Sequence, residues 1–176
     1  MEQLEKLFPD LSLEHVKSER NNAFHVACCY GHLDVAKWLF NMFQLTYHDV
    51  TTIHNHTFFH VYVNKHLHVA KWLVNTFCLG YYDATRENNH IFWIVCGKGH
   101  LQIAQWFVNT FKLTCQDVKS ENNEAFKQTC KNGHLEVVKW LVEEFPLIFA
   151  DDTSQYSSLF SWICLNGFLN LLFWPG

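Results

Sequence analysis

Histidine is the residue type with the most obvious potential for chemistry in this chain, which holds 12 of them in 176 residues. Imidazoles bind zinc or copper and transfer protons near neutral pH. One set recurs every 34 residues, and a leucine follows each member: His32, His66, His100 and His134. On successive packed helices, about 8–10 Å apart, they cannot share a zinc ion whose nitrogen ligands lie at about 2.1 Å. We expect them to hydrogen-bond loop carbonyls instead.

A second set of histidines is concentrated between residues 54 and 68. It comprises His54, His56, His60, His66 and His68. His56 and His60 would share one helix face, a spacing that can hold zinc or copper. No Cys, Asp or Glu lies nearby in the sequence to complete a ligand set. We therefore expect no metal site and no cofactor, and we keep His56 and His60 as the ligands of an alternative, metal-binding function.

No pattern typical of catalysis is present. The chain has no Gly-x-Ser-x-Gly, no phosphate-binding glycine loop and no paired carboxylates set against an apolar pocket. Cys28 lies near His25 and His32, but it belongs to a periodic column of small residues, with Cys96, Cys130 and Cys164, that should pack between helices. We therefore expect no catalytic residue and no enzymatic activity.

Cysteine usage and charge narrow the class of protein further. Seven cysteines without paired spacing, and no recognisable signal peptide, favour a reducing compartment, and we expect the cytoplasm. The net charge is −4 and the 13 Lys and Arg are scattered, so nucleic-acid binding is not expected. The apolar stretch 159–174 is interrupted by polar residues and is shorter than the ~20 residues that span a bilayer, so no membrane association is expected.

Tryptophan and phenylalanine follow the same 34-residue period as the histidines. The two columns are Trp38, Trp72, Trp106, Trp140 and Trp174, and Phe43, Phe77, Phe111 and Phe145. A period of this length indicates stacked supersecondary units that share one continuous apolar core. We therefore predict a single solenoid domain over 1–176. It comprises a half repeat 1–16, full repeats 17–50, 51–84, 85–118 and 119–152, and an incomplete repeat 153–176.

Each repeat should hold a helix-turn-helix hairpin. The first helix should follow a capping column of asparagine or serine: Asn21, Asn55, Asn89, Asn123 and Ser157. After about nine residues it should end at a glycine, which tolerates the left-handed backbone that stops a helix. These glycines are Gly31, Gly99, Gly133 and Gly167. Lys65 takes this place in the second repeat, where the turn should be looser or strained.

The second helix should begin at the leucine after each periodic histidine. In the first full repeat its polar residues form one narrow stripe: Asp34, Lys37, Asn41 and Gln44. The remaining positions are apolar. A helix with this pattern is packed between neighbours.

The segment Ala23–Leu39, Ala-Phe-His-Val-Ala-Cys-Cys-Tyr-Gly-His-Leu-Asp-Val-Ala-Lys-Trp-Leu, resembles the ankyrin repeat. The likeness recurs in all four full repeats and is strongest at Gly133–Leu141. Departures are systematic: Trp replaces a Leu, Ala-Phe replaces Pro-Leu, and Phe-x-Leu-Thr replaces the Gly-Ala-Asp-Val-Asn of the finger. This variant is similar to ankyrin proteins of large DNA viruses of amoebae and protists. The resemblance implies an all-α or nearly all-α solenoid with irregular loops or very short strands as fingers.

The resemblance also implies a non-catalytic protein–protein interaction scaffold, with a host protein as partner and the host cytoplasm as location if the chain is viral. A truncated remnant of a repeat gene family without a selected partner is a further alternative. Self-association through the apolar C-terminal repeat is also expected. The binding surface that the family implies is the exposed side of the first helices: Val26, Cys29, Tyr30, His60, Val63, Trp93, Ile94, Gln128 and Lys131.

Overall fold

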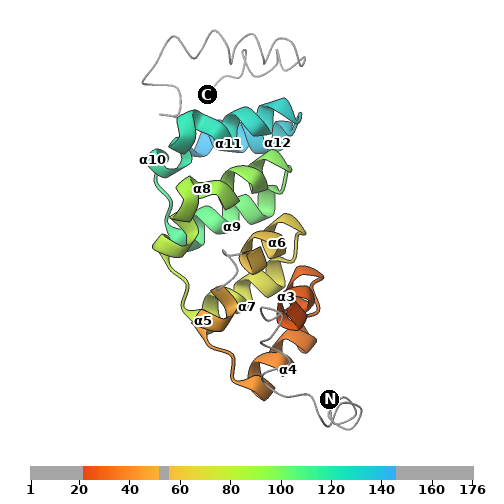
Figure 1. Cartoon of the computed structure of the whole chain (residues 1–176). Helices are drawn as coiled ribbons and strands as arrows, with labels where there is room; N and C mark the ends of the chain where they lie inside the picture. The colour runs from red at the N-terminus through yellow and green to blue at the C-terminus, as the bar shows by residue number, and fades with distance from the viewer. Residues whose placement is uncertain (1–21, 52–55, 146–176) are drawn as a thin grey trace. The chain divides into compact units, whose positions relative to one another are not determined.

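The computed structural model describes residues 22–51 and 56–145, and every regular element in these ranges is a helix (Figure 1). The all-α expectation is confirmed for this part of the chain. The chain divides into two compact units, residues 1–79 and residues 80–176, which are described separately below.

Unit 1 contains two helical hairpins and one short connecting helix. Its helices are α3 (Asn22–Cys29), α4 (Leu33–Phe43), α5 (Tyr47–Thr51), α6 (His56–Val63) and α7 (Leu67–Phe77). The first helices of the two hairpins, α3 and α6, pack side by side (Figure 1).

Unit 2 repeats this arrangement with longer first helices. Its helices are α8 (Tyr81–Gly97), α9 (Leu101–Phe111), α10 (Cys115–Val118), α11 (Ser120–Lys131) and α12 (Leu135–Glu144). Here α8 and α11 are the first helices, and they also pack side by side (Figure 1).

The second helices confirm the expected start at leucine and the expected two-sided pattern. The polar stripe of α4 is exposed, whereas Ala36, Leu39 and Phe43 are buried. In every described repeat the Trp and Phe columns form an edge-to-face pair that spans five residues. Ring centroids lie 6.2 Å apart for Trp38–Phe43, 6.5 Å for Trp72–Phe77, 5.9 Å for Trp106–Phe111 and 6.1 Å for Trp140–Phe145. Such pairs add stability beyond the apolar area that they bury.

The turn between the two helices of each hairpin has the same geometry in all four repeats. Gly31, Gly99 and Gly133 have φ between 74° and 78°, and Lys65 has φ 67°. Lys65 N–H donates to the Tyr62 carbonyl at 3.2 Å, as Gly31 N–H donates to the Cys28 carbonyl at 3.1 Å. The expected looser turn is therefore wrong, because the hydrogen bonds are the same. The lysine is strained, since its Cβ is crowded in the left-handed region.

The turn glycine is also in close contact with the next repeat. A Cβ atom on Gly31 would lie 2.5 Å from His66 Nδ1, and one on Gly99 would lie 2.5 Å from His134 Nδ1. Within each unit, the histidine of the second hairpin therefore lies directly against the turn of the first. Glycine is required here by both the left-handed backbone and the space that the imidazole occupies.

The expected capping role of the asparagine column is wrong in unit 2. Asn89 lies inside α8 and Asn123 inside α11, with φ of 61° and 62°. The helices begin before these residues, and asparagine tolerates the left-handed region better than most residues. Asn89 Nδ2 donates to the Asp117 carbonyl at 3.0 Å and lies 3.3 Å from Ser120 Oγ, so this side chain connects the two repeats. The expected helix length of about nine residues is close for α3 and α6, with eight each, but too short for α8 and α11.

The fingers that the structure describes are helical, not the expected irregular loops or very short strands: α5 and α10 are separate short helices, and the finger between them in sequence forms the first turn of α8. The cause is a capping box, in which an aspartate three residues after the N-cap residue accepts a hydrogen bond from the N-cap backbone N–H. Asp117 Oδ2 accepts from Thr114 N at 2.7 Å and from Thr114 Oγ1 at 2.7 Å. The same arrangement joins Thr46 to Asp49, and Gly80 N donates to Asp83 Oδ2 at 2.9 Å.

Several sequence predictions lie outside the described residues. They concern the half repeat 1–16, the incomplete repeat 153–176 with its expected self-association, and the cap positions Asn21, Asn55 and Ser157. The single solenoid over 1–176 likewise stays a prediction.

Lys65→Gly should stabilise the protein by about 0.5–1 kcal/mol, because glycine relieves the left-handed strain and loses only part of that gain to unfolded-state entropy. The matched control is Lys98→Gly. Lys98 has φ −94°, so glycine should lower stability there by about 0.5–1 kcal/mol. Urea unfolding followed by tryptophan fluorescence measures both changes. A destabilised Lys65→Gly would contradict the strained turn.

Thr114→Ala should destabilise unit 2 by about 1 kcal/mol, because it removes the hydroxyl from the capping box. Burial raises the pKa of Asp117, but hydrogen bonds from Thr114 and Tyr81 outweigh it and hold that pKa below its usual value. The contribution of these bonds is therefore complete above the ordinary aspartate pKa and is lost as pH falls through the lowered one. The difference in the free energy of unfolding between wild type and Thr114→Ala should therefore shrink in acid. Thr110→Ala, at an exposed position in α9, is the control and should change stability by less than about 0.5 kcal/mol.

Candidate functional site

In each unit, the candidate site is the side of the first helices that the second helices do not cover, which we call the first-helix face of that unit. In unit 1 this face comes from α3 and α6. Val26 is 42 % exposed and Tyr30 68 % exposed, while His60 and Val63 are half-buried. Cys29 is only 7 % exposed, so it contributes little to this surface.

A polar cluster lies along the unit 1 part of the face. His25 Nδ1 lies 3.0 Å from the hydroxyl of Thr57, a buried residue of the neighbouring repeat. The Cys29 thiol lies 3.4 Å from His25 Nε2, and the rings of His25 and His60 meet edge to face at 5.6 Å. The cluster fixes the orientation of two imidazoles across the boundary between α3 and α6.

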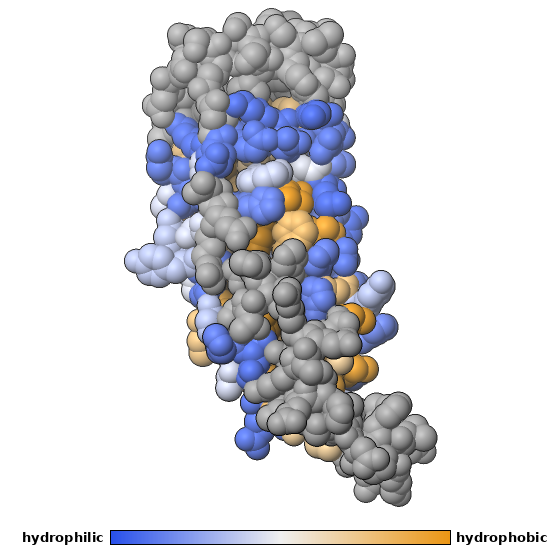
Figure 2. All heavy atoms as spheres, viewed as in Figure 1, coloured by the Kyte–Doolittle hydropathy of each residue, from blue (hydrophilic) through white to orange (hydrophobic). Residues whose placement is uncertain are grey.

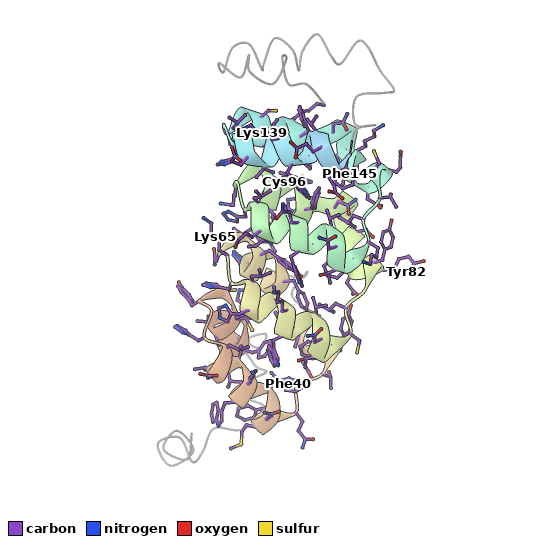
Figure 3. All side chains as sticks on the ribbon, turned by 180° about the vertical axis from the view of Figure 1, so that it is seen from behind. Phe40, Lys65, Tyr82, Cys96, Lys139 and Phe145 are labelled. Carbon is purple, nitrogen blue, oxygen red and sulfur yellow. The ribbon has the colours of Figure 1, made fainter. Side chains whose placement is uncertain are left out.

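The Cys29–His25 pair resembles a nucleophile and its base, but its electrostatics do not favour that role. Burial raises the pKa of Cys29 to about 11, so almost none of it is thiolate at neutral pH. Burial also raises the pKa of Cys28, Cys96 and Cys130, the last to about 12. Cys96 lies among the helices of unit 2, whereas Tyr82 projects outward (Figure 3). These thiols are packing residues.

In unit 2 the first-helix face comes from α8 and α11. Trp93 and Ile94 are half-buried on α8, and the Trp93 ring lies 4.7 Å from that of His90. On α11, Gln128 is half-buried and Lys131 is exposed. Figure 2 shows apolar residues at the surface over α8 and mainly polar residues over α11. The two helices therefore offer neighbouring surfaces of different chemistry.

Two asparagines beside the face bond one repeat to the next. Asn64 Nδ2 donates to the Cys29 carbonyl at 2.9 Å, and Asn132 Nδ2 donates to the Gly97 carbonyl at 2.6 Å. These positions vary between repeats, as recognition positions would. Their hydrogen bonds give them a structural role that the sequence did not reveal.

The fingers carry a second exposed aromatic group. Tyr82 is 85 % exposed, and its ring lies 5.8 Å from that of Tyr81. The Tyr81 hydroxyl donates to Asp117 Oδ1, which connects adjacent fingers of unit 2. Of these two tyrosines, Tyr82 is the one that presents most of its surface to solvent.

The residues of the alternative metal site are only partly described. His54 and the side chain of His56 lie outside the description, and His60 contacts the rings of His25 and Phe59. Among the described side chains, no group of three His, Cys, Asp or Glu is placed to hold a metal ion.

The periodic histidines occupy the N-cap position of the second helices. His66 hydrogen-bonds the backbone of Cys29, in agreement with the expected contact to a carbonyl. Burial and the nearby His68 and His32 lower the pKa of His66. His68 Nε2 also lies 3.0 Å from the Gly31 carbonyl oxygen. His66 and His68 thus contact the end of α3 and the turn that follows it.

Within the described ranges, no helix is long and apolar enough to cross a membrane. Comparison with protein families gives two matches: ankyrin repeats (3 copies) over residues 57–156, and a single ankyrin repeat over residues 19–43. No curated protein and no solved structure matches the chain. The first match covers more than half of the 176 residues. The helical hairpins with their glycine turns agree with it, and the chain belongs to the ankyrin-repeat family.

Proposed function

We propose that this chain is a non-catalytic module that binds a protein partner through its first-helix face. Ankyrin repeats are protein–protein interaction scaffolds, and the family is typically non-enzymatic. The observation that carries the proposal is the contrast within one helix of unit 1. Phe24 and Cys28 of α3 are completely buried, whereas Val26 and Tyr30 of the same helix leave large apolar areas uncovered.

The aromatic content of the face supports binding. Tyr30 is exposed, and Trp93 is half-buried beside the ring of His90. Tryptophan and tyrosine are enriched among the residues that dominate protein interfaces, where truncation of one costs about 2 kcal/mol or more. Rigid helices present these side chains without the entropy cost of ordering a loop.

The burial of Cys28, Cys96 and Cys130 supports a non-catalytic role for these thiols. Cysteine is the strongest potential nucleophile in the chain, and burial raises the pKa of Cys28, Cys96 and Cys130. The proposed module therefore acts through the shape and chemistry of its surface.

A host-cell protein is the partner that we propose, with the host cytoplasm as the place of action. The support is the resemblance of the Trp-Leu and Phe-x-Leu-Thr variant to viral ankyrin proteins. Self-association through the apolar segment 159–174 is a separate proposal, which rests on its sequence alone.

Alanine at Ile94 and at Lys131 should weaken partner capture from amoeba lysate by about tenfold or more without lowering the melting temperature. Quantitative mass spectrometry of the captured proteins measures the first effect, and thermal unfolding the second. The control is Asn109→Ala, at an exposed position on α9 outside the face. It should leave capture unchanged.

A different set of substitutions tests whether the fingers are the binding surface instead. If the face variants capture the same proteins as wild type, whereas alanine at Tyr47, Tyr81 and Tyr82 abolishes capture, the fingers are the binding surface. That result would overturn the proposed function as stated.

A further inference from the structure

Helices α8 and α11 form one closely packed surface in unit 2. Gly97 is buried, and a Cβ atom there would lie 3.0 Å from the Cβ of Gln128, so glycine is what allows the approach. The Asn132 amide bonds the Gly97 carbonyl at 2.6 Å. The two helices are therefore held at a fixed spacing. Their shared surface does not have to reorder when a ligand binds.

The α8 side of this surface is apolar and aromatic. Trp93 and Ile94 are half-buried, so each keeps area that a partner side chain can cover, and Figure 2 shows apolar residues at the surface over this helix. The contact between the Trp93 and His90 rings, at 4.7 Å, restrains the indole. A leucine or phenylalanine side chain of a partner would find a preformed apolar contact here.

The charges beside this apolar area are predominantly positive. Lys98 is the C-cap residue that follows α8, and on α11 Lys127 and Lys131 occupy the positions one repeat after Trp93 and Gly97. The carboxylate on the same stretch of α11 is Glu124, whose Oε1 accepts from Gln128 Nε2 at 2.6 Å. The Glu124–Lys131 stretch of α11 and the adjacent C-cap of α8 thus carry three lysines and one carboxylate, in a chain whose net charge is −4.

The positive charge is concentrated at one end of the surface. Lys98 and Lys131 lie at the C-terminal ends of their helices, whereas Glu121 lies at the N-terminal end of α11. Ten residue positions of α11 separate Glu121 from Lys131. A bound segment would therefore place its apolar side chain over Trp93 and Ile94 and its acidic residues toward Lys98 and Lys131.

We infer that the first-helix face of unit 2 binds an acidic peptide segment that is anchored by a large apolar side chain. This inference rests on the proposed function and names the chemistry of the partner. Complementary charge orients such a segment and speeds its association, and the apolar anchor supplies most of the contact area.

The test uses the full chain and three fluorescein-labelled peptides. The first contains Leu-Phe followed by a run of Asp and Glu, the second replaces the acidic run with lysines, and the third replaces Leu-Phe with Ser-Ser. By fluorescence anisotropy, the first should bind at least about tenfold more tightly than the other two. Its affinity should fall as ionic strength rises, because exposed charges are screened. Equal binding of all three peptides, or no binding of the first, overturns the inference.

Lys131→Glu locates the binding and Lys112→Glu is its matched control, since Lys112 is an exposed lysine at the end of α9. Lys131→Glu should weaken the acidic peptide by at least about tenfold, and Lys112→Glu should have little effect. Lysine at a helix C-terminus also complements the helix dipole. If Lys131→Glu lowers only the stability and leaves peptide affinity intact, the lysine has that structural role alone and the inference fails.

The lysate experiment distinguishes failure of this inference from failure of the proposed function. If Ile94→Ala abolishes partner capture while the acidic peptide does not bind, the face is a binding surface for a partner of other chemistry. If the substitutions at Ile94 and Lys131 change neither partner capture nor peptide binding, both proposals fail.

Discussion

The contact between a turn glycine and the histidine of the following repeat is the constraint on which the stacking within each unit depends. His66 lies against Gly31 in unit 1, and His134 lies against Gly99 in unit 2, each with no room for a Cβ atom. Because the same glycine also adopts a left-handed backbone, the end of one hairpin and the position of the next are set at a single residue. A larger residue would have to move the whole neighbouring hairpin, since packed interiors leave little free volume.

Once the turns are in register, the first helices are bonded side by side. Asn64 and Asn132 each donate to the backbone at the end of the preceding first helix, and His25 meets Thr57 across the same boundary in unit 1. Hydrogen bonds of this kind are directional and specify one spacing, which apolar contacts alone do not. The side that remains uncovered is therefore a fixed surface, and this is why a handful of side chains can define its chemistry.

The sequence predicted the hairpins and the start of each second helix because apolar periodicity and the leucine column report packing directly. It did not predict the role of Asn89 and Asn123, since asparagine favours both an N-cap and the left-handed region, and only the location of the helix start distinguishes them. The helical fingers were predictable from the aspartate three residues after Thr46 and Thr114. That signal was missed because the absence of the usual finger sequence suggested irregular structure. The burial of Cys29 had no sequence signal, because its column also contains Val63, Gly97 and Lys131.

Variation between repeats is weak evidence for recognition when it is taken alone. Tyr30, Asn64, Lys98 and Asn132 form one variable column. Its two asparagines hydrogen-bond the neighbouring repeat, whereas Tyr30 is 68 % exposed. The same column thus serves both stacking and surface, and the hydrogen bond to the preceding backbone is what separates the two roles. Residues that stacking does not use are the ones whose chemistry is open to selection by a partner, and on α8 and α11 these are the apolar and lysine side chains.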